Sequence, residues 1–92
     1  MEIQLTKRFR AVVRKLSADN AAAVDAALEE LLVTFGRPHL HVGASVRTIR
    51  PAVYELRASL ALRIIFTQEE GVLKVDFVGD HDAVRRYLRN MR

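Results

Sequence analysis

The sequence predicts a single α+β domain, in which helices pack on an antiparallel sheet. Between residues 53 and 78, three segments alternate apolar with polar residues at a period of two, as half-buried strands do. Before them, residues 7–35 carry two helical patterns with apolar stripes. Ninety-two residues, of which 50% are hydrophobic, are enough for one core, so one domain is expected over residues 1–92.

The N-terminal part of the chain is expected to form a short strand and two helices. Residues 3–5 alternate apolar and polar side chains, and this strand could pair with the sheet. Thr6 is a suitable N-cap for a helix that runs to Leu16. A second helix, made of strong helix formers, is expected over residues 18–35 and ends at Gly36. Together they form a helical hairpin with one basic and one acidic helix.

Residues 37–45 are typical of a loop. They contain His39 and His41, a pair that could bind a metal, but no third ligand follows at a suggestive spacing. No metal site is therefore expected. Residues 46–50 suggest the start of a strand, and Pro51 then indicates a sheet edge or a bend.

Three strands of a meander are expected at residues 53–57, 60–67 and 72–78, with a polar turn at 68–71. One face of this meander is continuously apolar and should meet the helices. It comprises Leu60, Leu62, Ile64 and Phe66, continued by Leu73, Val75 and Phe77. The other face carries charged residues: Glu55, Arg57, Arg63 and Lys74. After Gly79 the pattern becomes helical and rich in arginine.

The charge is segregated along the chain, which has a net charge of +4. Residues 1–16 are basic, residues 17–35 are acidic, and residues 36–67 are basic again. A basic first helix, sheet face and last helix could surround one surface that binds a polyanion. Equally, these charges could form an ordinary solvated exterior.

Several classes of protein are excluded by composition. The chain has no cysteine, so it has neither disulfides nor thiolate chemistry. It contains no apolar run long enough to span a membrane. Residues 1–5 lack the layout of a secretory signal, so a cytoplasmic protein is expected.

Three stretches carry a resemblance to a known family: Tyr54-Glu55-Leu56-Arg57, Leu62-Arg63-Ile64-Ile65-Phe66 and Val78-Gly79-Asp80-His81-Asp82. In this order and at this separation they resemble the RelE/ParE toxin superfamily of bacterial type II toxin–antitoxin modules. The resemblance implies a cytoplasmic toxin that is neutralised by a cognate antitoxin in a hetero-oligomer. RelE-like members cleave mRNA in the ribosomal A site without a metal or cofactor, whereas ParE-like members act on DNA gyrase.

The resemblance also implies roles for particular residues. In RelE-like members a ribose 2′-hydroxyl attacks the adjacent phosphate, which requires proton transfer and stabilisation of the phosphorane charge. Arg63 would bind the scissile phosphate and Arg57 would be a second phosphate contact, while His81 would be the general acid or base and Glu55 the alternative base. Further basic residues would hold the RNA: Lys7, Arg8, Arg10, Arg14, Arg47, Arg50, Lys74 and Arg85.

Some of these residues have a structural alternative. Glu55 could pair with Arg57 or Arg63 as a surface ion pair. Asp80 could cap the last helix, which would leave His81 as a linker residue.

The family often has a tyrosine at the start of the last helix, where this chain has Arg85 and only later Tyr87. Either Tyr87 is a core residue and Arg85 joins the site, or the activity is weak. A ParE-like gyrase inhibitor and a catalytically weak nucleic-acid-binding member are therefore the alternative functions.

Overall fold

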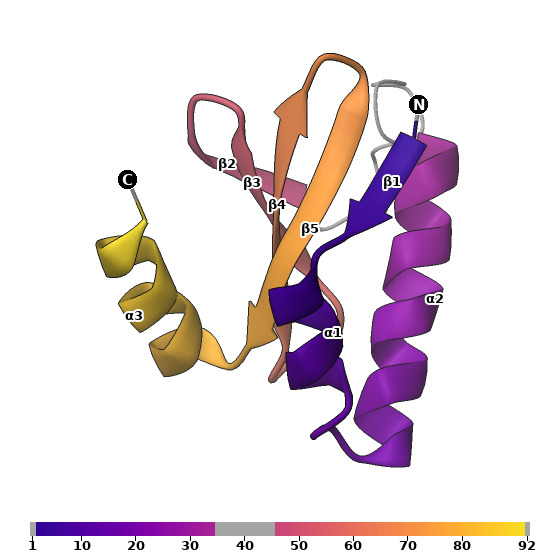
Figure 1. Cartoon of the computed structure of the whole chain (residues 1–92). Helices are drawn as coiled ribbons and strands as arrows, with labels where there is room; N and C mark the ends of the chain where they lie inside the picture. Colours follow the sequence, from indigo (N-terminus) through magenta and orange to yellow (C-terminus); the bar gives the residue numbers. More distant parts are fainter. Residues whose placement is uncertain (1, 35–45, 92) are drawn as a thin grey trace.

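The computed structural model describes residues 2–34 and 46–91 (Figure 1). The elements follow in the order β1 (Glu2–Leu5), α1 (Lys7–Val13), α2 (Ala18–Thr34), β2 (Val46–Arg50), β3 (Val53–Arg57), β4 (Arg63–Glu69), β5 (Val72–Gly79) and α3 (His81–Asn90). The predicted α+β class is confirmed, with the N-terminal strand, the helical hairpin, the meander and a short C-terminal helix all present. The expected end of the second helix, the loop at 37–45, and His39 and His41 lie outside the described residues.

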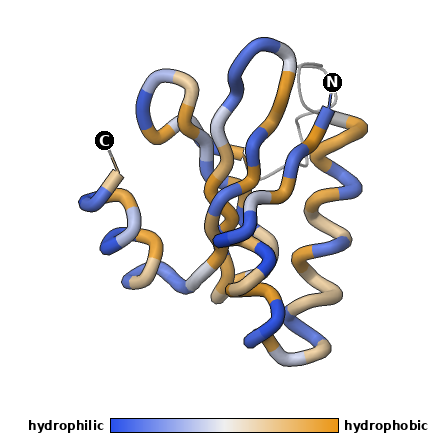
Figure 2. The backbone as a smooth tube through the Cα atoms, in the orientation of Figure 1, coloured by the Kyte–Doolittle hydropathy of each residue, from blue (hydrophilic) through white to orange (hydrophobic). Residues whose placement is uncertain are grey.

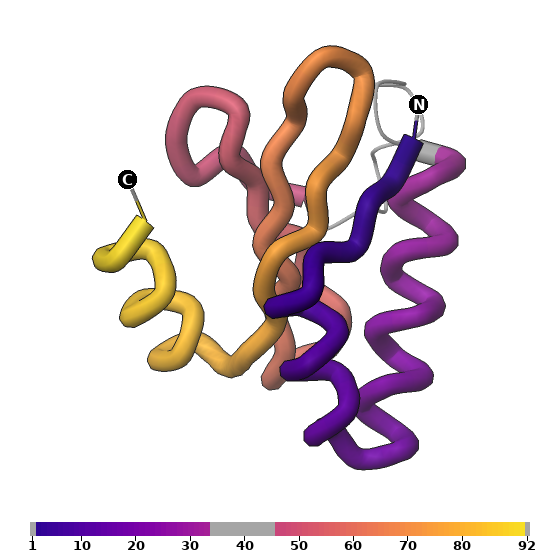
Figure 3. The backbone as a smooth tube through the Cα atoms, viewed as in Figure 1, coloured from indigo at the N-terminus to yellow at the C-terminus, as the bar shows by residue number. Residues whose placement is uncertain are grey.

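The five strands form one mixed sheet in the order β1-β5-β4-β3-β2. Strands β2 to β5 are a continuous antiparallel meander, so the expected strand at 46–50 is its first member. β1 pairs in parallel with β5, with Ile3 opposite Leu73, and Figure 3 shows the two tubes running side by side. The β4–β5 turn is made by Glu70 and Gly71, both at positive φ (50° and 79°), which is the backbone of a tight type I′ hairpin.

Helices α1 and α2 cover one face of the sheet and enclose the main core. Thr6 caps α1 as predicted, because its Oγ1 accepts a hydrogen bond from the Phe9 N–H at 3.1 Å. Ser17 caps α2 in the same way through the Asn20 N–H. The buried residues of this core are Phe9, Val24, Ala27, Leu31, Leu56, Leu62, Ile64, Phe66, Leu73, Val75 and Val78. In Figure 2 hydrophobic and hydrophilic stretches alternate along the strands, whereas the β4–β5 tip is largely hydrophilic.

Helix α3 covers the opposite face of the sheet (Figure 1) and adds a second, smaller core. Ile65 is fully buried there between Val53 and Val84. This face is therefore only partly polar: the charged residues occupy one part of it and α3 covers another.

Two expectations about the strands were wrong. Leu60 is 92% exposed and precedes β4, because the Ser59 hydroxyl accepts hydrogen bonds from the Ala61 and Leu62 N–H groups and turns the chain. Phe77 does not share a face with Leu73 and Val75. The register shift in the β4–β5 pairing places Phe77 opposite Ile65 but Val75 opposite Phe66, so that Asp76 is an extra, bulged residue.

None of the helices within residues 2–34 and 46–91 is long and apolar enough to cross a bilayer.

Candidate functional site

Three charged residues from three neighbouring strands meet on the α3 face of the sheet. Arg47 on β2 lies directly opposite Glu55 on β3, and Arg63 begins β4. The Oε2 atom of Glu55 lies 3.2 Å from Nη2 of Arg47 and 3.4 Å from Nη1 of Arg63. The side chains of Glu55 and Arg63 are only 10% and 17% exposed, whereas that of Arg47 is 66% exposed. Glu55 is thus a nearly buried carboxylate held by two guanidinium groups.

Arg57 adds a further positive charge at the end of this cluster. It is exposed and lies directly opposite Arg63 in the β3–β4 register, which places both side chains on one face. The predicted common face of Glu55, Arg57 and Arg63 is therefore confirmed. With three arginines against one carboxylate, this part of the face has surplus positive charge and can attract a phosphate.

His81 is the first residue of α3 and is exposed to solvent. It follows Gly79, which lies opposite Arg63 in the β4–β5 register. Asp80 between them caps α3, because its Oδ1 accepts a hydrogen bond from the Ala83 N–H at 2.8 Å. The capping alternative for Asp80 is confirmed, while a catalytic role for His81 stays a prediction. Gly79 is required by space, since a Cβ there would lie 2.9 Å from the Cβ of Ala83.

The other predicted RNA-binding residues do not form one cluster. Arg50 donates from Nη2 to the Leu88 carbonyl at 3.1 Å and so ties the C-terminal end of α3 to β2. Lys74 makes a long, exposed ion pair with Glu69 at 3.9 Å, which contributes little energy. The remaining residues are exposed on α1, on the segment after it and on α3: Lys7, Arg8, Arg10, Arg14 and Arg85. Their roles stay predictions.

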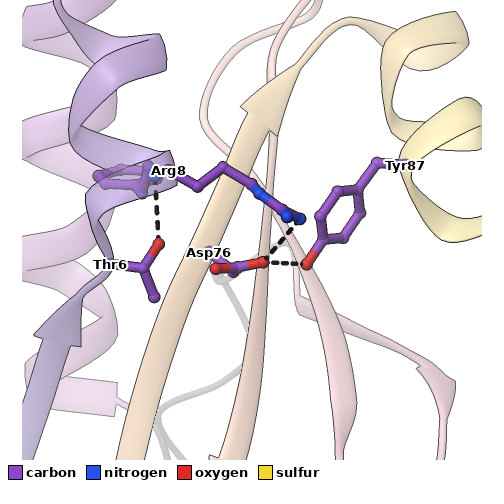
Figure 4. A network of polar contacts seen from close by, with 5 residues as sticks. Thr6, Arg8, Asp76 and Tyr87 are labelled. Atoms are coloured by element: carbon purple, nitrogen blue, oxygen red, sulfur yellow. Dashed lines mark hydrogen bonds and ion pairs between the residues drawn. The ribbon is translucent and has the colours of Figure 1, made fainter. Parts of the chain in front are cut away.

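A second polar group, which the sequence did not reveal, joins α1, β5 and α3 (Figure 4). Oδ2 of Asp76 accepts a hydrogen bond from the Tyr87 hydroxyl and lies 3.4 Å from Nη1 of Arg8. The Arg8 guanidinium also lies 5.6 Å from the centroid of the Tyr87 ring, on which Phe77 stacks at 4.6 Å. These residues line a pocket of about 710 Å³ together with Ala83, Arg86, Asn90 and Met91.

The surroundings of Tyr87 fix its protonation state. Burial raises the pKa of Tyr87 above its usual value of 10.0, and the hydrogen bond to Asp76 and the charge of that carboxylate raise it further. At neutral pH the phenol is therefore a hydrogen-bond donor. Partly buried and stacked on Phe77, Tyr87 is a packing residue in this structure, whereas Arg85 is exposed.

No group of three metal-binding side chains occurs within the part of the chain that the structure describes. The arginine cluster, made of Arg47, Arg57 and Arg63 around Glu55, offers guanidinium groups whose geometry suits a phosphate.

No protein-family model and no curated protein sequence matches this chain. Solved structures do match. The toxin–antitoxin complex RelB–RelE from Methanococcus jannaschii has a TM-score of 0.70 at 13% identity, over 90% of this chain and 95% of that chain. The isolated RelE toxin from E. coli has a TM-score of 0.64 at 18% identity, over 98% of both chains. This chain has the RelE fold.

The RelE fold is also that of YafQ from E. coli, which matches at a TM-score of 0.62 and 14% identity over 90% of this chain and 96% of that chain. At such low identities the likeness establishes the fold alone. The family resemblance inferred from the sequence is confirmed at that level. The chemistry has to be argued from the residues that this chain places on the RelE fold.

Proposed function

We propose that this protein is the toxin of a type II toxin–antitoxin module and that it cleaves mRNA on the ribosome. The observation that carries the proposal is the arginine cluster on the α3 face, where Arg57 lies opposite Arg63 and Glu55 holds Arg47 and Arg63. It is supported by the RelE fold, which extends over 98% of the E. coli RelE toxin. Cleavage would proceed by attack of a ribose 2′-hydroxyl on the adjacent phosphate.

The reaction requires a cation at the phosphorane and groups that move two protons. Arg63 would bind the scissile phosphate, because its guanidinium is planar and permanently charged. Arg57, opposite it, would bind the same or the next phosphate. The Glu55 carboxylate already forms ion pairs with two guanidinium groups, so it is engaged in the free protein. The side chain of His81 is exposed and has no hydrogen-bond or ion-pair partner among residues 2–34 and 46–91, so it is the better candidate for proton transfer.

The expected protein partner is a cognate antitoxin, which would form a hetero-oligomer with the toxin in the cytoplasm. The matching structures from Methanococcus jannaschii and Pyrococcus horikoshii are RelE–RelB complexes. The sheet of this chain ends in β1 on one side and β2 on the other, and such edges invite cover by another chain.

The proposal is tested by induced expression in a bacterial host, with growth and mRNA 5′ ends measured together. The wild type should arrest growth and create new 5′ ends at codon-related positions. Arg63→Ala should reduce cleavage by about 10²–10³-fold, as loss of a charge-stabilising group does. His81→Ala should reduce it by about 10²–10⁴-fold if His81 transfers a proton.

Arg89→Ala is the matched control, because Arg89 is an exposed arginine in the last turn of α3. It should leave arrest and cleavage unchanged. Arrest by Arg63→Ala at the wild-type level would contradict the assigned site. Arrest without new 5′ ends but with gyrase-dependent DNA damage would favour the ParE-like alternative. RNA binding without arrest would favour the catalytically weak one.

A further inference from the structure

Two guanidinium groups converge on one oxygen atom in the arginine cluster. Arg47 reaches Oε2 of Glu55 from β2 and Arg63 reaches the same atom from β4, at 3.2 and 3.4 Å. Glu55 lies on β3 between these strands. The position of Oε2 is therefore a place where a single anionic oxygen contacts two guanidinium groups on opposite sides.

We propose that Arg47 and Arg63 form one phosphate subsite and that the Glu55 carboxylate occupies it when no ligand is bound. A phosphate oxygen that binds there takes the place of Oε2 and displaces the carboxylate from both arginines. Arg47 is thereby assigned a role as a direct ligand of the phosphate next to Arg63. This inference rests on the proposed function only in naming the phosphate as that of an RNA backbone.

Carboxylate and phosphate are bound by guanidinium groups with the same planar geometry, so one can replace the other. They cannot be bound together at one oxygen position, because two anions at such a separation repel each other strongly. Glu55 therefore competes with the ligand instead of assisting its binding.

The competing carboxylate also has a stabilising role in the free protein. Arg63 is 17% exposed, and a nearly buried cation without a partner is costly. Glu55 removes that cost and keeps Arg63 directed to the point where the phosphate will bind. Glu55 is thus a positioning residue for the two arginines. Because an anion must first break the ion pairs of Glu55, the affinity of the subsite for any anion is lowered.

A ligand binds only when its contacts offset the free energy lost when the Glu55 ion pairs break. A small free anion has only this subsite to offset the loss of the Glu55 ion pairs, and should bind weakly. An RNA chain also contacts other cations, such as Arg57 opposite Arg63, and can displace the carboxylate. The subsite therefore favours an extended, otherwise anchored polyanion over the free phosphates of the cell.

The test is a titration of the purified protein with inorganic phosphate at constant ionic strength, with chloride as the balancing anion. Phosphate binding is followed by the shift in the thermal unfolding midpoint and by the NMR signals of the arginine side chains. Glu55→Gln keeps the shape of the side chain and removes its charge. We expect this variant to bind phosphate at least about tenfold more tightly than the wild type, because a nearby anion is removed.

Arg63→Ala in the Glu55→Gln background should abolish the gain, and Arg47→Ala in the same background should reduce it. The inference is overturned if Glu55→Gln binds phosphate no better than the wild type, or if the gain persists without Arg63. Glu55→Asp provides a second variant in case the amide does not fold. Its shorter side chain withdraws the carboxylate from both guanidinium groups, and it should also bind more tightly than the wild type.

Failure of this inference can be told apart from failure of the proposed function. The phosphate titration involves neither mRNA nor a ribosome, and the comparison of its variants reports on Glu55, Arg47 and Arg63. The expression experiment reports on cleavage. A wild type that produces no new mRNA ends would refute the proposed nuclease, and the titration would still decide whether Glu55 occupies the subsite.

Discussion

Tyr87 shows how one residue can join three elements. Its ring stacks on Phe77 of β5 and lies near the Arg8 guanidinium of α1, while its hydroxyl donates to Asp76. The hydroxyl can donate to Asp76 only while the phenol is protonated, and the ring contacts exist only while α3 is in place. Tyr87 therefore ties the last helix to the first through the bulged residue of β5.

Replacing Tyr87 by Phe should change how stability depends on alkaline pH. The pKa of Tyr87 is raised above 10.0 in the folded chain, so its contribution is complete below the pKa of the unfolded state. That contribution is lost as the pH rises from about 10 toward the folded pKa. The free energy of unfolding, measured by urea denaturation between pH 8 and 11, should fall less steeply for Tyr87→Phe than for the wild type. Parallel curves would mean that Tyr87 has the same pKa in the folded and the unfolded chain.

At the scale of the element, α3 is fixed at both ends by side chains that form hydrogen bonds with its unpaired backbone groups. Asp80 accepts from the Ala83 N–H at the start, and Arg50 donates to the Leu88 carbonyl at the end. Between these ends, Val84 is the buried residue of the helix. Because His81 is the first residue of α3, the contacts that fix the helix also fix the position of His81.

Asp80→Ala should destabilise the protein by about 1 kcal/mol, since it removes the N-cap and a favourable charge at the helix N-terminus. Chemical denaturation of both proteins measures this difference. Asp80→Asn is the matched control, because asparagine caps as well as aspartate, and it should cost much less. Equal losses for the two variants would indicate that the charge matters and the cap does not.

At the scale of the whole molecule, the sheet is packed unequally on its two faces. Among residues 2–34 and 46–91, eleven buried residues form the core under α1 and α2, whereas Val53, Ile65 and Val84 form the core under α3. Because stability follows buried apolar surface, the two faces should open at different free energies.

Native-state hydrogen exchange should show this difference directly. Amides of β4 and β5 in the centre of the sheet should exchange only by global unfolding, and those of α3 should exchange through a smaller, local opening. Val84→Ala should speed amide exchange in α3, while the amides of β4 should remain among the slowest to exchange. Equal protection in α3 and β4 would show instead that the molecule opens as one unit.

The sequence was sufficient for the elements that local patterns define. Thr6 as N-cap, the strand at 53–57 and the pairing of residues 3–5 with the sheet were predicted and are confirmed. The bulge at Asp76 was not predicted, because it is a property of the pairing between two strands and leaves the alternation of either strand nearly intact. The different faces of Phe77 and Val75 follow from that bulge.

The sequence predicted which residues of the candidate site share a face of the sheet, but not the contacts between their side chains. Period-two alternation placed Glu55, Arg57 and Arg63 together, as the register confirms. Arg47 and Arg63 share one oxygen of Glu55. This contact depends on the stagger of three strands, which cannot be predicted from a local sequence pattern. The contact of Arg8 with Tyr87 joins residues far apart in the chain and was likewise invisible.

The parallel pairing of β1 with β5 makes the order of synthesis matter. Residues 2–5 are made first, yet their partners are residues 72–75, and three other strands are synthesised in between. Such distant pairing is slow to form, and β1 has to wait for it with an unpaired backbone. A translation product that stops before residue 72 would contain β1 and the residues Arg47, Glu55, Arg57 and Arg63, but it would lack β5, which lies between β1 and β4 in the sheet. Interrupted synthesis should therefore yield chains that lack the proposed nuclease activity.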